Sequence, residues 1–152
     1  MNLGAAGDSF GYRLFFLLHI IAIVVAFAPA FVVPVLQSRY KRAGEAIPPQ
    51  LMRMFSANGM QIHGPALVLI GVFGMAMVGM SNDLFTFSQT WVSIALALWL
   101  LIMVVVFGGI IPGERKAAAG DTAVESRVAA LGGVVHLLFL LMVIDMVWKP
   151  GV

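Results

Sequence analysis

The stretch LFFLLHIIAIVVAFAPAFVVPVLQS, residues Leu14–Ser38, decides the fold of this chain. It holds no charged residue and is bounded by Arg13 and Arg39. A helix needs roughly 20 consecutive apolar residues to cross a bilayer, and this run is longer than that. One histidine, His19, interrupts it. Because a polar ring inside a membrane span is costly without a partner, His19 is the first candidate for a functional residue.

Three further uncharged runs follow, and the four together predict an all-α, membrane-spanning four-helix bundle. Of the 152 residues, 61% are hydrophobic and 11% are charged, whereas soluble domains carry about 25% charged residues. The runs do not alternate between apolar and polar residues, and in lipid a helix satisfies its own backbone hydrogen bonds. We therefore expect one domain over residues 1–152, with helices near 14–37, 62–80, 91–111 and 128–148.

The positive charges predict the orientation of this bundle. Only Arg13 and Lys149 flank the helices on the side of the termini, whereas the loops after the first and third helices hold seven basic residues. These are Arg39, Lys41, Arg42, Arg53, Arg115, Lys116 and Arg127. The positive-inside rule then places both loops in the cytoplasm and both termini outside, in an integral protein of the bacterial cytoplasmic membrane. The pI near 9.4 reflects residues that flank apolar runs, so we expect the lipid bilayer as a partner and no nucleic acid.

His19 and His136 are the candidate cofactor-binding residues. His19 shares a helix face with Ala26, a small residue that lets another helix approach closely. Gly132-Gly133 precedes His136 on its own face and leaves room for a backbone or a flat ligand. Buried imidazoles in a helical bundle serve as axial ligands of a b-type haem. The alternative, which we favour from the sequence, is that both are buried polar residues hydrogen-bonded across helices.

Methionine is abundant, with ten residues, and part of it gathers in one segment. Met52, Met54 and Met60 lie close to His63 in the sequence. Thioethers select Cu(I), so these four residues are candidates for a copper site. The alternative is that the methionines are flexible fillers of apolar helices and that His63 is an ordinary interfacial residue.

Asp145 and Lys149 are spaced i, i+4 near the end of the fourth helix. This order suits an ion pair on the helix surface, and because Asp145 lies only about one turn from the membrane interface, we expect its side chain to snorkel to that interface. The functional alternative is that Asp145 takes part in a proton relay. Because Asp145 follows His136 by nine residues, the two lie on opposite faces of the helix.

Two stretches resemble a group of small bacterial membrane proteins. YRLFFLLHIIAIVVAFAPAF (Tyr12–Phe31) is similar to the first helix of uncharacterised four-helix predicted integral membrane proteins, and more distantly of copper-resistance D domains and the HemJ-type protoporphyrinogen oxidase. LLMVIDMVWKPGV (Leu140–Val152) resembles the Lys-Pro ending of the last helix in several of these families. The resemblance implies a haem-binding role for His19 and a structural or porphyrin-side role for Lys149. The third run lacks the lysine and histidine associated with the HemJ-type oxidase, so the uncharacterised group fits better.

Three functions remain open at this point. A non-enzymatic structural or accessory subunit of a membrane assembly needs the fewest assumptions; it predicts a tightly packed core and a homo-oligomer or other membrane subunits as partners. A haem b protein for electron transfer or porphyrin oxidation needs His19 beside a cavity, and as an enzyme it would be an oxidoreductase. Copper handling is the third. No Walker loop, serine–histidine triad or paired carboxylate is present, so no catalytic residue is assigned. The lack of cysteine excludes disulfides and thiolate metal sites.

Overall fold

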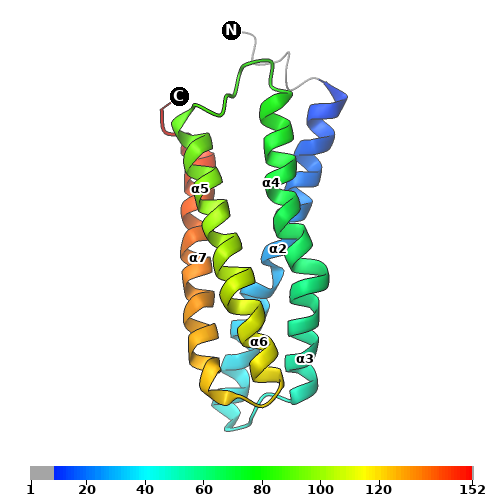
Figure 1. Ribbon diagram of the computed structural model, residues 1–152, viewed down its shortest axis with the longest axis vertical. Helices are drawn as coiled ribbons and strands as arrows, with labels where there is room; N and C mark the ends of the chain where they lie inside the picture. The colour runs from blue at the N-terminus through cyan, green and yellow to red at the C-terminus, as the bar shows by residue number, and fades with distance from the viewer. Residues whose placement is uncertain (1–8, 152) are drawn as a thin grey trace.

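The computed structural model describes residues 9–151, and every regular element among them is helical (Figure 1). The elements are α2 (Phe10–Ala43), α3 (Pro49–Asn58), η1 (Gly59–His63), α4 (Gly64–Gly79), α5 (Thr90–Val105), η2 (Val106–Ile110), α6 (Ile111–Ala118), η3 (Thr122–Val124) and α7 (Glu125–Trp148). They join into four continuous helical segments, each long and apolar enough to cross a membrane. The predicted bundle of four apolar helices is therefore confirmed.

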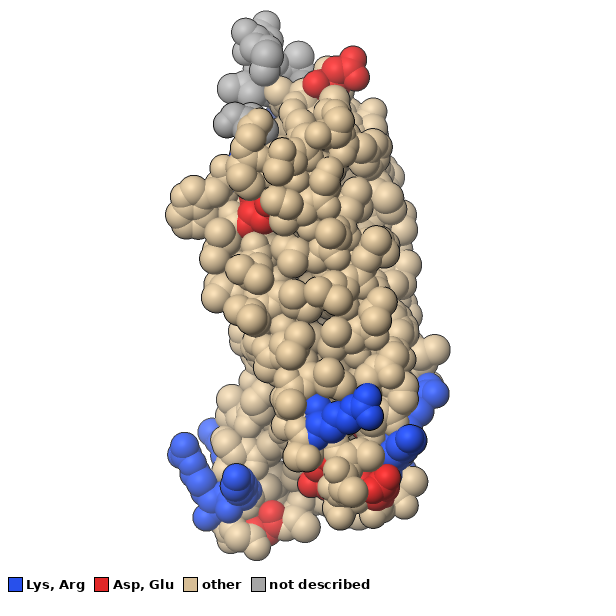
Figure 2. Space-filling model, turned by 60° about the vertical axis from the view of Figure 1, so that its left-hand side comes forward, with Lys and Arg blue, Asp and Glu red and all other residues tan. Residues whose placement is uncertain are grey.

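The two ends of the bundle differ in charge. The start of α2, the end of α7 and the α4–α5 loop lie at one end, which we call the terminal end (Figure 1). The α2–α3 and α6–α7 loops lie at the other end, where Lys and Arg side chains gather with a few Asp and Glu (Figure 2). We call this the basic end. The broad surface between the ends carries almost no charge on the face shown, which fits a segment that contacts lipid.

The four helices form two pairs. α2 packs along α4, and α5 packs along α7 (Figure 1). The pairs approach each other most closely at the basic end, where α3 lies against α6. The core is a cluster of buried apolar side chains contributed by all four helices. Its members are Ala22, Phe27, Leu67, Ile70, Ile102, Val135, Leu138 and Met142.

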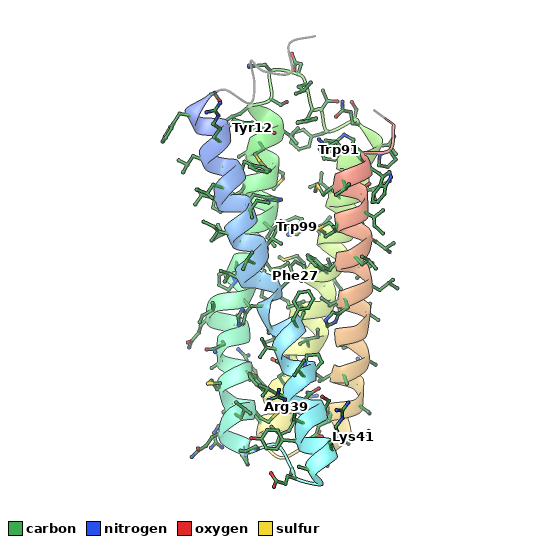
Figure 3. All side chains as sticks on the ribbon, turned by 180° about the vertical axis from the view of Figure 1, so that it is seen from behind. Tyr12, Phe27, Arg39, Lys41, Trp91 and Trp99 are labelled. Carbon is green, nitrogen blue, oxygen red and sulfur yellow. The ribbon has the colours of Figure 1, made fainter. Side chains whose placement is uncertain are left out.

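One tryptophan links the two pairs at mid-height. Trp99 Nε1 of α5 donates a hydrogen bond of 2.9 Å to the Leu67 carbonyl of α4. Gly71 makes this approach possible, because a Cβ on it would lie only 2.3 Å from the Trp99 ring. Trp99 and Phe27 both lie in the middle of the bundle in Figure 3. We call Leu67, Gly71, Trp99 and Phe27 the middle layer.

The second and third helices are longer than predicted. The second runs over Pro49–Gly79 instead of 62–80, and the third over Thr90–Ala118 instead of 91–111. The predicted end of the third helix at residue 111 was therefore wrong. The first helix, Phe10–Ala43, and α7 also extend a few residues beyond the predicted 14–37 and 128–148.

A π-turn before each proline explains why these two helices continue. Gly64 N–H bonds to the Gly59 carbonyl, and Ile111 N–H to the Val106 carbonyl, five residues back instead of four. Pro65 and Pro112 then stand in the first turn of α4 and α6. In the first turn of a helix, the N–H that proline lacks would have no intrahelical acceptor. The wider turn before the proline also relieves the clash of its ring with the preceding carbonyls.

Candidate functional site

All three histidine rings are oriented in the same way. In each, Nδ1 lies within hydrogen-bond distance of a backbone carbonyl oxygen: His19 to Ile70 at 2.9 Å, His63 to Val25 at 2.7 Å and His136 to Gly132 at 2.8 Å. A carbonyl can only accept, so Nδ1 carries the proton and, in the neutral ring, Nε2 keeps its lone pair. This arrangement fixes one tautomer and prepares Nε2 to bind a metal or to accept a proton.

His19 lies in a cavity of about 270 Å³ between the helix pairs, which we call the terminal cavity. The residue is only 7% exposed, so it faces the bundle as predicted. Tyr12, Trp91, Trp99 and Lys149 line the same cavity, and Figure 3 shows the three aromatic side chains spread from the terminal end to mid-height. This space is apolar except for His19 and the residues at its outer end.

A glycine brings α4 close to the His19 ring. A Cβ on Gly74 would lie 3.3 Å from His19 Cε1, tighter than ordinary contact. The Ile70 carbonyl that accepts from His19 lies one turn before Gly74, where the regular helix also presents it to the Gly74 N–H. Two donors therefore share one acceptor, and the absence of a side chain at Gly74 permits this.

The predicted ion pair between Asp145 and Lys149 was wrong. Lys149 leaves the helix with φ +44°, and its Nζ lies 4.7 Å from the Phe85 ring centroid and 5.4 Å from that of Trp91. Asp145 is only 6% exposed, so its side chain is covered by other residues instead of lying free on the helix surface. Within residues 9–151, neither of its carboxylate oxygens has a hydrogen-bond partner. A buried carboxylate without a partner in a membrane helix is expensive.

His63 and His136 share a second and larger cavity of about 470 Å³, which we call the basic-end cavity. Glu114, Gln37 and Asn58 also line it. The sequence did not predict this set. We expected His63 near a helix end, but the second helix begins at Pro49, so His63 lies well inside it.

A proline explains the position of His63. Pro29 has no N–H, so the Val25 carbonyl, four residues earlier in α2, loses its intrahelical donor. His63 Nδ1 of η1 donates to this carbonyl at 2.7 Å. The histidine thus replaces the hydrogen bond that the proline removed. The spacing Val25–Pro29 is visible in the sequence, but it does not show which helix lies opposite.

The two candidate haem ligands do not meet. His19 lines the terminal cavity and His136 the basic-end cavity, with the middle layer between them. His136 instead contacts Phe31, whose ring stands edge-on to it at 5.7 Å between centroids. Any group held by His19 in this structure therefore has no second axial ligand from His136.

The methionines proposed for copper do not share a cavity with His63. Met54 is 50% exposed and Met60 is 47% exposed. Neither they nor Met52 line either cavity. Among residues 9–151, no group of three or more His, Asp and Glu side chains is close enough to hold a metal.

Comparison with protein-family models, curated proteins and solved structures found no match to this chain. The resemblance carried by Tyr12–Phe31 and Leu140–Val152 therefore stays a prediction. The features from which a function follows are the two cavities, their oriented imidazoles and the buried Asp145 carboxylate.

Proposed function

We propose that the chain is a small integral membrane protein that binds haem b in the terminal cavity, with His19 as the axial ligand. The observation that carries this proposal is the hydrogen bonding of the two nitrogens of the His19 ring. Its Nδ1–H is held by the Ile70 carbonyl, while Nε2 has no hydrogen-bond partner within residues 9–151 and is not sealed inside the protein. Haem iron is commonly bound by an imidazole oriented in this way.

A second observation concerns Lys149. It lines the same cavity as His19 although 130 residues separate the two in the sequence. The Lys149 ammonium and the Tyr12 hydroxyl lie at the terminal end, where the carboxylates of a porphyrin would reach water. A haem in this position would supply one-electron chemistry, and the residues around it would hold it and keep water from its faces.

The side chains that line the terminal cavity suit a haem better than the volume of the cavity does. The imidazole, the apolar aromatic wall and a cation at the outer end match the parts of a haem. The cavity of about 270 Å³ is smaller than the roughly 300–1,000 Å³ found for small-molecule sites. A porphyrin needs more room than this, so binding it requires the two helix pairs to separate further along the terminal half.

An absorption spectrum tests the proposal. Protein produced with excess haem should show a Soret band and a reduced-minus-oxidised α-band. His19→Ala should lose both bands, and His136→Ala, the matched control, should keep them. A colourless protein, or bands that survive in His19→Ala, would overturn the proposal. A colourless and fully folded protein would favour the accessory-subunit role instead.

We also propose that the basic end faces the cytoplasm of a bacterial cell. The positive-inside rule and the charge difference between the two ends support this orientation (Figure 2). Because the chain has no cysteine, single cysteines report the topology cleanly. In intact cells, a membrane-impermeant maleimide should label Ser88→Cys in the α4–α5 loop and not Ala119→Cys in the α6–α7 loop. The reverse pattern would contradict the orientation.

A further inference from the structure

The helices of this bundle are irregular around one space, the basic-end cavity. Pro29 and Pro34 of α2 line it, and so do residues of both π-turns, η1 and η2. π-turns are rare and are found frequently at functional sites. In lipid each such irregularity risks unsatisfied backbone groups, so it is maintained against a cost. Irregularities from three helical segments at one cavity indicate a binding site.

Five polar side chains line this cavity; three of them present hydrogen-bond acceptors, and the other two, Gln37 and Asn58, carry amide groups that both donate and accept. His63 and His136 both use Nδ1–H on backbone carbonyls, which leaves each neutral ring with an accepting Nε2. The Glu114 carboxylate is half-buried and forms no ion pair with any residue of 9–151. A ligand that satisfies these groups must therefore bring hydrogen-bond donors of its own.

The walls of the cavity are apolar and partly aromatic. Phe27, Phe31 and Phe55 line it, and most of the remaining lining is aliphatic. The edge-on contact of Phe31 with His136 places an aromatic ring directly beside one of the acceptors. A flat apolar ring that carries donors on its rim fits both the walls and the acceptors.

Glycines keep this space open. Gly132 and Gly133 line the cavity, and a Cβ built on either would meet no atom within 4 Å. The cavity of about 470 Å³ falls inside the roughly 300–1,000 Å³ range of small-molecule sites. A larger side chain at either glycine would occupy the space without striking the backbone.

We propose that the basic-end cavity binds a lipid-soluble hydroquinone, whose two hydroxyl groups donate to two of three acceptors, the Nε2 atoms of His63 and His136 and the Glu114 carboxylate. The oxidised quinone offers only acceptors and can bond to the Gln37 and Asn58 amides alone, whereas hydroxyl groups can bond to those amides and also donate to the histidines or Glu114, so the cavity selects the reduced form. A lipophilic ammonium also carries donors, but the Lys and Arg side chains at this end repel a cation (Figure 2). The site uses none of the residues proposed for haem, so the two proposals stand independently.

Binding of a decyl-substituted hydroquinone to the full chain in lipid nanodiscs tests this inference. Under anaerobic conditions at pH 8, equilibrium dialysis should show the hydroquinone bound at least tenfold more tightly than the matching quinone, because the quinone loses both donated hydrogen bonds and one alone is worth about a factor of ten. His136→Ala should weaken hydroquinone binding by a similar factor. His19→Ala should leave it unchanged, whether or not that variant still binds haem.

A filled cavity provides the second arm. Gly132→Leu should abolish hydroquinone binding, and Gly133→Leu serves as the replacement if Gly132→Leu does not fold. Gly79→Leu is the matched control, because a Cβ there also meets no atom within 4 Å but Gly79 lies at the terminal end of α4. Equal affinity for quinone and hydroquinone, tighter binding of dodecylammonium, or undiminished binding in the folded Leu variants would each overturn the proposal.

Discussion

The two cavities hold histidines by the same kind of hydrogen bond, but His19 and His63 obtain their acceptors differently, while His136 of the basic-end cavity uses the Gly132 carbonyl of its own helix. In the terminal cavity the helices are regular, and His19 shares the Ile70 carbonyl with the helix itself. In the basic-end cavity Pro29 vacates the Val25 carbonyl, and His63 takes it over at 2.7 Å. In a regular helix the carbonyl already accepts from a helix N–H, so His19 shares it. The proline leaves the Val25 carbonyl without an intrahelical donor, so His63 is its donor. The middle layer keeps the two arrangements apart.

Gly71→Ala is expected to have the largest effect, because it disturbs the layer between both cavities. Its Cβ would lie 2.3 Å from the Trp99 ring, so the tryptophan must leave its place and lose its bond to Leu67. Overpacking of this kind typically destabilises a protein by about 1–3 kcal/mol. Unfolding in detergent measures the change. Gly79→Ala, on the same helix with open space around its Cβ, should be nearly neutral; equal effects of the two would refute the packing shown here.

Asp145→Leu probes the terminal half alone and should stabilise the protein. The wild-type carboxylate is buried and has no hydrogen-bond partner within residues 9–151. An unsatisfied buried polar group costs about 1–3 kcal/mol, and an apolar residue of similar size removes that cost. Thermal unfolding should show a higher midpoint for Asp145→Leu and a smaller gain for Asp145→Asn. A lower midpoint for the leucine variant would mean that the carboxylate has a stabilising partner.

Pro29→Ala probes the basic-end half alone. The alanine restores an N–H that competes with His63 for the Val25 carbonyl. One hydrogen bond replaces another, so the free energy of unfolding should change by less than about 1 kcal/mol. The local effect should nevertheless be clear, because the ¹⁵N-histidine NMR signal of the His63 Nδ1–H should shift or disappear. Pro34→Ala, in the same helix, should leave that signal in place. No response to Pro29→Ala would remove the proposed link between the proline and His63.

Features of the fold and of the candidate site could be predicted from the sequence where they depend on neighbouring residues in the chain, and not where they depend on contacts between helices. The four helices follow from uncharged runs, and the inward face of His19 follows from its register with Ala26, so both were predicted and confirmed. The pairing of His63 with Val25 was not, because it depends on which helix lies opposite. The Asp145–Lys149 ion pair failed because Lys149 adopts a left-handed backbone and no longer continues the helix. Local patterns therefore predict spans and faces, whereas the partners of polar side chains depend on packing.

Trp99→Phe should have the smallest effect and sharpens the role of the middle layer. Phenylalanine keeps most of the ring packed on Gly71 but cannot donate to the Leu67 carbonyl at 2.9 Å. Hydrogen bonds between membrane helices are worth about 0.6 kcal/mol on average, so a loss of about that size is expected. Trp148→Phe is the matched control, since that side chain is 74% exposed. If both variants unfold alike, the layer is held by packing on Gly71 alone, and the two cavities are separated by shape without a hydrogen bond between the helix pairs.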